Sequence, residues 1–283
     1  MRGLRTRSAT RVLGPADIGA AVDLCAQSPE ENVFVAARLR EGALTGTGGS
    51  VIGYEEGGEL VALCYTGANV VPVATSSRTR ALMLDKVRRG RRRTASLLGP
   101  ADQVIPLWEL LEDQWGPARS VRAPQPHLAT SRPASEFGIS ADPRVRPAAP
   151  GETDLVLPAA EHMFTSEIGY PPYRGSSRAY RGMLARLIEQ RHTYVIVESG
   201  RVIFKADLGS VALGCAQIQG VWVAPELRGQ GLGTAGMAGV IDYVLAEVAG
   251  TATLYVNHFN TAARATYERI GMQHIGNFAT VLL

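Results

Sequence analysis

The chain of 283 residues has little cysteine, little lysine and no long apolar run. Its three cysteines, Cys25, Cys64 and Cys215, lie far apart and form neither a Cys-x-x-Cys motif nor a Cys/His pairing. We therefore expect reduced, partly buried thiols and no metal site. No apolar run approaches the ~20 residues that span a bilayer. The basic first seven residues are followed by no apolar signal core, which favours a cytoplasmic location.

Charge is also sparse. Charged residues make up 19% of the chain and the net charge is +3, too small an excess to indicate nucleic-acid binding. Hydrophobic residues make up 46%, as in soluble globular proteins. Alanine, glycine and arginine are abundant where lysine is scarce, a composition associated with high-GC bacterial genomes.

The length suggests two domains of about 140 residues each. A proline-rich stretch from Pro117 to Pro150 is typical of a boundary. We therefore divide the chain into residues 1–140 and 141–283. The second half predicts strands at 145–148, 193–197, 201–207, 213–223, 253–256 and 274–283, and helices at 154–168, 177–190, from the glycines near 231 to Gly250, and 260–270.

The most informative stretch is 221–234, where a strand meets a glycine-rich turn and a helix. Such a turn exposes backbone N–H groups at the positive end of a helix. Gly231 and Gly233 would let phosphates approach the backbone without a Cβ in the way. The turn lacks the Gly-Lys-Ser/Thr of a P-loop and the glycine spacing of a dinucleotide fingerprint. It therefore predicts a pyrophosphate site of another kind.

Arg228-Gly229-Gln230-Gly231-Leu232-Gly233 fits Arg/Gln-x-x-Gly-x-Gly/Ala, and an apolar-x-Pro-Glu stretch precedes it. The turn thus resembles the pyrophosphate loop of GNAT N-acetyltransferases, and the element order over about 143–283 resembles theirs too. The resemblance implies an α/β fold (an α+β mixed sheet) and acetyl-CoA as co-substrate. It implies cofactor contacts from Val221, Trp222, Val223, Arg228, Gly229, Gln230, Gly231, Leu232, Gly233 and Thr234.

A second motif supports the resemblance. Asn260-x-x-Ala263-x-x-x-Tyr267-x-x-x-Gly271-Met272 is similar to the closing GNAT pattern, with Met272 in place of the usual Phe. By resemblance, the strand before it splays from Val221–Val223, and the unpaired backbone groups bind the pantetheine arm. Further cofactor contacts would come from Asn257, Asn260, Ala263, Arg264 and Tyr267.

The resemblance also implies chemistry. Asn260 would cap a helix as well as contact pantetheine. Tyr267 would protonate the departing thiolate, or it only packs under its helix. Gln217 and Gln219, on the strand before the loop, cannot act as bases. Glu161, His162 and Glu167 in the first helix, and Glu198 and Asp207 at strand ends, remain open beside a water relay, and Glu161 is our candidate base.

The first half repeats this element order weakly, with helices at 17–27, 32–41 and 103–114 and strands at 50–55, 59–65, 70–74 and 95–98. Leu-Gly-Pro-Ala-Asp occurs at 13–17 and 98–102, each time entering a helix. Residues 74–78 stand where the glycine loop would be. We expect tandem GNAT-like domains whose first member is degenerate and binds no cofactor.

The sequence therefore predicts direct acetyl transfer from acetyl-CoA to a primary amine of a small molecule or peptide, by a protein that could form a homodimer. The alternative is a non-catalytic acyl-CoA-binding regulatory module. A basic cluster remains unassigned: it is a solvated helix end, or it binds an anionic partner or the cofactor's adenosine phosphate, and a nucleic-acid role is the least favoured. Its members are Lys86, Arg88, Arg89, Arg91, Arg92 and Arg93.

Overall fold

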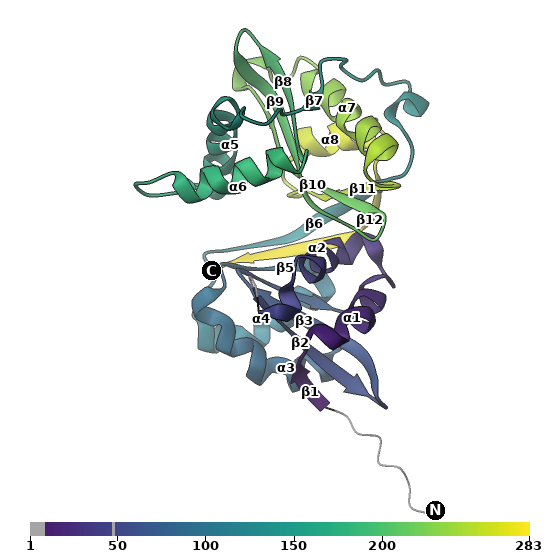
Figure 1. The fold of residues 1–283 in the computed structure, drawn as a ribbon, viewed down its shortest axis with the longest axis vertical. Coiled ribbons are helices and arrows are strands. Elements are labelled where there is room, and N and C mark those ends of the chain that lie inside the picture. Colours follow the sequence, from purple (N-terminus) through teal and green to yellow (C-terminus); the bar gives the residue numbers. More distant parts are fainter. Residues whose placement is uncertain (1–8, 47–48) are drawn as a thin grey trace, which may run out of the picture. The chain divides into compact units, whose positions relative to one another are not determined.

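The computed structural model describes residues 9–46 and 49–283, so the basic first seven residues lie outside the described part (Figure 1). The chain forms two compact units. Unit 1 is Met1–His127 with Tyr255–Phe259 and Ile275–Leu283, and unit 2 is Leu128–Leu254 with Asn260–His274. The division into independent domains near residue 140 stays a prediction.

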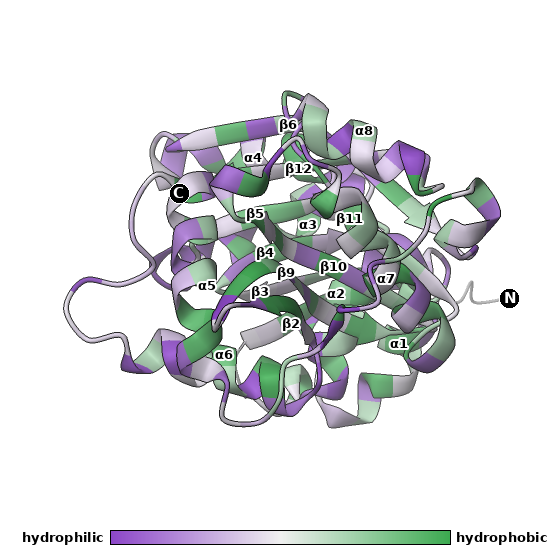
Figure 2. Ribbon diagram, turned by 90° about the horizontal axis from the view of Figure 1, so that it is seen from above, coloured by the Kyte–Doolittle hydropathy of each residue, from purple (hydrophilic) through white to green (hydrophobic). Residues whose placement is uncertain are grey.

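Unit 1 is built on a mixed sheet with the strand order β1-β2-β3-β4-β5-β12-β6. Its pairings are antiparallel for β1–β2, β2–β3, β3–β4 and β5–β12, and parallel for β4–β5. Much of the sheet is hydrophobic (Figure 2), and every residue of β5 is buried. The strands are β1 Ala9–Val12, β2 Gly49–Glu56, β3 Glu59–Gly67, β4 Asn69–Val73, β5 Ser96–Pro100, β6 Ser120–Thr130 and β12 Gln273–Leu282.

Four α-helices accompany this sheet: α1 Ile18–Cys25, α2 Pro29–Arg40, α3 Ser77–Val87 and α4 Ala101–Trp115. Met83 of α3 and Leu107 of α4 share one buried cluster with Leu97 of β5 and Val281 of β12. The carboxyl-terminal strand therefore contributes to the core of unit 1. All three cysteines are buried, and burial raises the pKa of Cys25 and of Cys64 to about 12.

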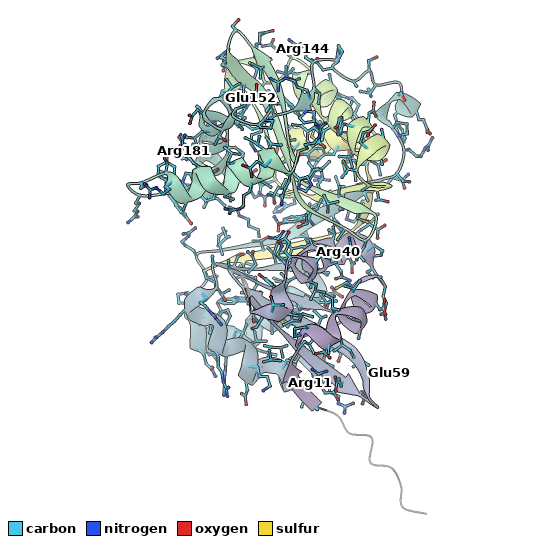
Figure 3. The ribbon with its side chains drawn as sticks, in the orientation of Figure 1. Arg11, Arg40, Glu59, Arg144, Glu152 and Arg181 are labelled. Carbon is cyan, nitrogen blue, oxygen red and sulfur yellow. The ribbon has the colours of Figure 1, made fainter. Side chains whose placement is uncertain are left out.

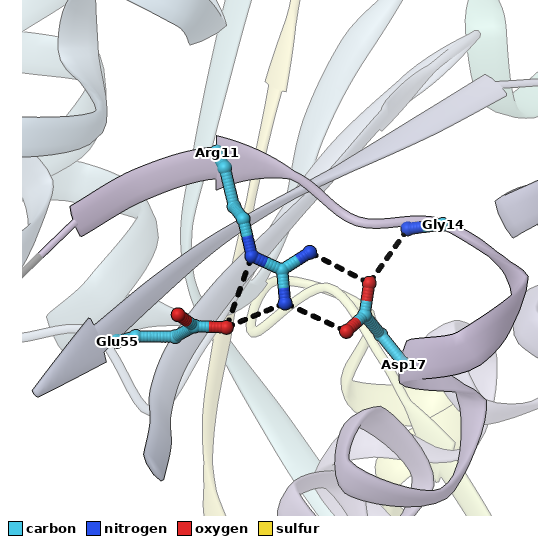
Figure 4. A network of polar contacts seen from close by, with 4 residues as sticks. All are labelled: Arg11, Gly14, Asp17 and Glu55. Atoms are coloured by element: carbon cyan, nitrogen blue, oxygen red, sulfur yellow. Dashed lines mark hydrogen bonds and ion pairs between the residues drawn. The ribbon is translucent and has the colours of Figure 1, made fainter. Parts of the chain in front are cut away.

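A polar network joins β1 to the entrance of α1 (Figure 4). The guanidinium of Arg11 donates to Glu55 Oε1 and, through Nη1 and Nη2, to both carboxylate oxygens of Asp17 at 2.7 and 2.6 Å. The backbone N–H of Gly14 also donates to Asp17, at 2.7 Å. Arg11 and then Gly14 lower the pKa of Asp17 to about 2. Both hydrogen bonds favour the charged carboxylate.

Unit 2 is built on the strand order β11-β10-β9-β8-β7, with the end of β6 also in this unit. Thr253 Oγ1 of β11 donates to Leu128 O of β6 at 3.0 Å. In Figure 1 the helices α5 and α6 lie on one side of β8–β10, and α7 and α8 on the other. The strands are β7 Arg146–Pro147, β8 Thr193–Glu198, β9 Arg201–Ala212, β10 Cys215–Val223 and β11 Thr251–Tyr255; the helices are α5 Thr153–Ile168, α6 Arg178–Glu189, α7 Leu232–Glu247 and α8 Thr261–Arg269.

Ion pairs hold the surface around α5. Arg144, Glu152 and Arg181 are labelled in Figure 3. Glu152 binds Arg146 with two bonds of 2.8 Å, Arg181 pairs with Asp154, and Arg144 pairs with Glu198 at 2.9 Å. Exposed pairs of this kind contribute little stability each, but they engage the acids concerned, including Glu198 from the set of candidate bases.

The expected elements of the second half are present, and the ends of two of them need correction. Strand β9 does not stop at Asp207 but continues to Ala212, and the hairpin turns at Leu213 and Gly214, which have φ of 55° and 73°. Helix α7 ends at Glu247, before Gly250. The proline-rich stretch, whose role as a domain boundary stays a prediction, contains the eleven-residue strand β6, which the sequence did not lead us to expect. Proline cannot donate to a sheet ladder, so prolines in a sequence argue against a strand even where one forms.

A helix was missed in the first half. Residues 74–78, expected as a loop in place of the glycine turn, include the start of α3. Ser76 caps this helix: its Oγ accepts from the backbone N–H of Thr79 at 3.2 Å. Thr75 N donates to Gln103 Oε1 at 2.8 Å, and Arg80 Nη1 donates to Thr75 O at 2.8 Å. The groups at this strand-to-helix junction are therefore already engaged within unit 1.

Candidate functional site

The central feature of unit 2 is a strand edge that loses its neighbour. The parallel ladder between β10 and β11 joins Cys215–Gln217 to Thr251–Thr253 and ends there. From Ile218 onward, β10 has no pairing with β11 among the described residues. Val221, Trp222 and Val223, expected to contact a cofactor, lie in this open part and are half-buried. Backbone groups along such an edge need partners.

The opposite edge of β10 is irregular at the same level. It pairs with β9 antiparallel, but the register shifts between Gln219, opposite Asp207, and Trp222, opposite Lys205. β10 therefore has one extra residue here, the arrangement of a β-bulge. Gly220 has φ of 58°, and a Cβ there would lie 3.0 Å from Asp207 Oδ2. Only glycine fits this backbone without strain.

After β10, the glycine turn forms the N-terminus of α7. Gly229 and Gly231 have φ of 75° and 86°, and Gly231 is the N-cap residue. The first donors to bond back are Thr234 and Ala235, whose N–H groups reach Gly231 O at 3.0 and 3.1 Å. Among the described residues, no backbone bond is made by the N–H groups of 229–233. They form a concave set of donors at a positive helix end, which suits an anion.

Two side chains of this turn donate hydrogen bonds to nearby backbone carbonyls. Arg228 Nε donates to Val223 O at 3.1 Å, and Gln230 Nε2 donates to Glu226 O at 2.9 Å. A Cβ added at Gly231 would meet nothing within 4 Å. The space over the turn is therefore open. Leu232, Gly233 and Thr234 form the first turn of α7, and all three are half-buried.

Helix α8 carries the second motif. Asn260 Oδ1 accepts from the backbone N–H of Ala263 at 3.2 Å, which confirms the expected N-cap. Arg264, beside Ala263, lies 3.9 Å from Glu268. Tyr267 is buried, with 6% of its surface exposed. Burial, followed by the charge of Glu167, raises its pKa above the ordinary value of 10.

Asn257 differs from the other residues of the predicted set in the unit to which it is assigned. It belongs to unit 1, where its Oδ1 accepts from Gln125 Nε2 at 2.9 Å. Its side chain thus has a structural partner. The other predicted cofactor residues all belong to unit 2.

On the α5 and α6 side of the sheet, phenols and acids lie together. Glu161 of α5 accepts a short hydrogen bond from the hydroxyl of Tyr173, which raises the Tyr173 pKa. Tyr180 of α6 donates to Ala160 O at 3.1 Å; burial and then Asp207 raise its pKa to about 12. Glu161 is therefore an ordered carboxylate rather than a freely solvated one.

His162, another candidate base, contacts β10 directly. Its Nδ1 accepts from Trp222 Nε1 at 2.9 Å, and the two rings meet edge to face with centroids 5.7 Å apart. This bond links α5 to the open part of β10. Glu167, one turn further along α5, is exposed.

The structure places a buried ion pair beneath the bulge, which the sequence did not lead us to expect. Lys205 is fully buried and pairs with Asp207, which is 5% exposed. Asp207 Oδ1 also accepts from Thr193 Oγ1 at 2.9 Å, and Lys205 Nζ lies 3.5 Å from Gly220 O. Asp207 was expected at a strand end. It lies in the interior of β9 instead, because that strand continues for five more residues.

A signal for this pair was present in the sequence. Lys205 is one of only two lysines in the chain. Residues two apart on a strand share a face, so Lys-x-Asp within the apolar run Val202–Leu208 puts opposite charges side by side. Removing two charges from water costs several kcal/mol per ion.

Comparison with family models finds matches to two separate stretches of the chain. Residues 161–272 match the family model described as the acetyltransferase (GNAT) family, and residues 49–156 match a domain of unknown function, DUF4081. A search of curated proteins finds no match in sequence.

Solved structures are similar over almost the whole length. A GCN5-related N-acetyltransferase from Sphaerobacter thermophilus is 20% identical, covering 98% of this chain and 95% of its own, with a TM-score of 0.62. A tandem GNAT protein from the clavulanic acid biosynthesis pathway is 17% identical and covers 98% of each chain, with a TM-score of 0.57. A GNAT-family acetyltransferase from Colwellia psychrerythraea is 11% identical over 97% of this chain and 99% of its own, with a TM-score of 0.54. These likenesses confirm the expected fold, a mixed sheet in tandem GNAT-like domains.

Proposed function

The chain carries a domain of the GNAT acetyltransferase family, and we propose that this domain transfers the acetyl group of acetyl-CoA to a primary amine. The observation that carries the proposal is the glycine turn at 229–233, whose N–H groups are unbonded within the described backbone beside an open strand edge. The pyrophosphate of acetyl-CoA would accept from those N–H groups. The pantetheine amides would pair with the backbone of Val221–Val223, where β11 has left β10.

The reaction is direct. The lone pair of the amine attacks the thioester carbonyl carbon, the C–N bond forms and the C–S bond breaks. One proton leaves the amine, and one proton ends on the departing sulfur. A cysteine nucleophile is disfavoured, because Cys215, the cysteine of unit 2, is buried and a buried thiol is a poor source of the thiolate that attacks.

Tyr267 supplies the proton, or the hydrogen bond, at the sulfur. Burial raises its pKa, which favours the neutral phenol that can donate a hydrogen bond. A thiol has a pKa near 8.5, so full proton transfer from such a phenol is uphill. Donating a hydrogen bond to the developing thiolate is the role that this environment allows.

Glu161 is the proposed proton acceptor on the amine side, directly or through a water molecule. Its carboxylate is fixed by Tyr173. Gln217 and Gln219 occupy β10 and offer no carboxylate there.

Lys205 and Asp207 act as positioning residues, because they hold the backbone of β10 and do not contact the substrate. The Lys205 ammonium bridges the Asp207 carboxylate of β9 and the Gly220 carbonyl of β10. It thereby satisfies a carbonyl that the bulge takes out of the regular ladder. The bulge directly precedes Val221, so holding it fixes the direction in which Val221–Val223 continue.

Unit 1 is the proposed degenerate partner. The equivalent strand-to-helix junction has Ser76 as cap and Thr75 bonded to Gln103 and Arg80, with no glycine turn. We therefore expect one acetyl-CoA per chain.

The alternative is a regulatory module that binds acyl-CoA without turnover, favoured by the absence of a carboxylate on β10. Release of free thiol from acetyl-CoA in the presence of an amine panel separates the two. Amine-dependent release supports the enzyme. Saturable binding without release supports the module.

A further inference from the structure

Part of the basic cluster lines a cavity in unit 1 that no step above uses. The cavity has a volume of about 140 Å³ and is lined by Val12, Ser50, Ile52, Thr66, Lys86, Arg89, Gly90 and Arg93. About 10–15 Å³ of such space holds one water molecule, so the cavity has room for a polyatomic ligand. Among the residues that the structure describes, none of those lining it carries a carboxylate.

The structure sorts the six cations of the cluster by their partners. Arg88 pairs with Asp85 at 2.7 Å. Arg91 donates to Trp115 O at 3.2 Å and lies over the Trp115 ring. Neither lines the cavity. The three that do, Lys86, Arg89 and Arg93, have no ion pair within residues 9–46 and 49–283.

Local geometry brings these three cations to one side. The chain continues from α3 into the 3-10 helix η3, Arg88–Arg93. Lys86 of α3 and Arg89 and Arg93 of η3 all line the same cavity, so three positive charges lie close together. Like charges in such proximity repel one another. An anion in the cavity would remove that repulsion.

We propose that this cavity is a binding site for the phosphate group of a small phosphorylated molecule. One ammonium and two guanidinium groups complement a doubly charged phosphate better than a singly charged carboxylate, and guanidinium forks match phosphate oxygens. A cavity of this volume admits a single phosphate group, whereas a nucleic-acid duplex presents a long row of phosphates. All residues that line the cavity belong to unit 1, whereas the glycine turn of the proposed acetyl-CoA site belongs to unit 2.

The three cations could instead stabilise the end of their helix, and the controls must separate that role from phosphate binding. Cations near the end of a helix also stabilise its terminal carbonyls. That role predicts lower stability on removing the charges, without any phosphate dependence. Arg92 is a matched control: it lies in the same 3-10 helix, carries the same charge and does not line the cavity.

The test uses the full chain with inorganic phosphate as the probe, chloride at equal ionic strength as the reference and duplex DNA as the competing ligand. Calorimetric titration and the rise of Tm with phosphate are measured for wild type, R89Q/R93Q and R92Q, together with acetyl-CoA affinity. We expect saturable phosphate binding in wild type and R92Q, at least a tenfold loss in R89Q/R93Q, and the same acetyl-CoA affinity in all three.

Four outcomes would overturn the proposal. They are no saturable phosphate binding by wild type, an equal loss in R92Q, a lower Tm of R89Q/R93Q with its phosphate response intact, and tighter binding of duplex DNA than of phosphate with a loss shared by R92Q. If R89Q/R93Q does not fold, the single variant K86Q is compared with R92Q by the same criteria. A failure of acetyl-CoA binding in wild type would remove the proposed function and leave the phosphate result standing.

Discussion

The buried pair of Lys205 and Asp207 gives the sharpest test of how the sheet of unit 2 is organised. Replacing Lys205 by Met keeps the length and removes the ammonium. Asp207 then stays 5% exposed, with Thr193 Oγ1 as its remaining hydrogen-bond donor. An unpaired carboxylate at such a site costs about 3–5 kcal/mol. We expect K205M to lower the free energy of unfolding by that amount.

The double variant K205M/D207V is the matched control. Removing both charges eliminates the unpaired ion, and replacing a buried pair by apolar residues is often neutral. Its free energy of unfolding should therefore return to within about 1 kcal/mol of wild type. Urea unfolding measured by circular dichroism, with the m-value compared between variants, gives both numbers.

Activity should not follow stability in this series. If the pair fixes the bulge at Gly220, K205M/D207V regains its fold but keeps a lower kcat, because the Gly220 carbonyl has lost its donor. A cost below about 1 kcal/mol for K205M would contradict the burial of the pair. Wild-type kcat in the double variant would refute the positioning role.

Three further variants test other parts of the account. Tyr267→Phe keeps the ring and removes the hydroxyl that donates, so kcat should fall by about 10²–10⁴-fold with acetyl-CoA affinity unchanged. The fall should be smaller for acyl thioesters with a more acidic thiol. A wild-type rate in this variant would make Tyr267 purely structural. The depressed pKa of Asp17 contributes stability that is complete above pH ~4 and is lost as the pH falls towards about 2. Because solvent screens this partly exposed pair, we expect the contribution to the free energy of unfolding to be about 1 kcal/mol and to be absent in D17N. Equal acid sensitivity of wild type and D17N in urea unfolding would count against the network. Gly236→Ala places a Cβ 2.7 Å from the buried Phe204 ring and should lower the free energy of unfolding by about 1–2 kcal/mol. The control G250A, whose Cβ meets nothing within 4 Å, should not lower it. Equal Tm values of the two variants would argue against close packing of Gly236 on Phe204.

Features of the site that depend on neighbours in the sequence were predictable. The glycine turn at 229–233 and the cap at Asn260 follow from the residues themselves, because turns and caps are set by a few consecutive side chains. The strand before the turn and the helix after it were found for the same reason. Their expected roles towards acetyl-CoA stay predictions.

Features that depend on distant pairing were not predictable. The strand β6 forms despite Pro124 and Pro126 because other strands supply its partners, and Val256 N donates to Pro126 O at 3.1 Å. The bulge at Gly220 exists only in register with β9. The Lys-x-Asp spacing places Lys205 and Asp207 on one face of their strand, but the burial of the pair depends on the elements that pack around β9.

The measurement that tests the central claim most directly is calorimetric titration of acetyl-CoA into wild type and Gly231→Asp, combined with thiol release in the presence of an amine panel. The N-cap position of Gly231, with φ of 86°, places an added carboxylate beside the proposed pyrophosphate. We predict one acetyl-CoA per wild-type chain, amine-dependent thiol release, and loss of both in a folded Gly231→Asp protein. Unchanged acetyl-CoA affinity in that variant, or two equivalent sites in wild type, would contradict the account.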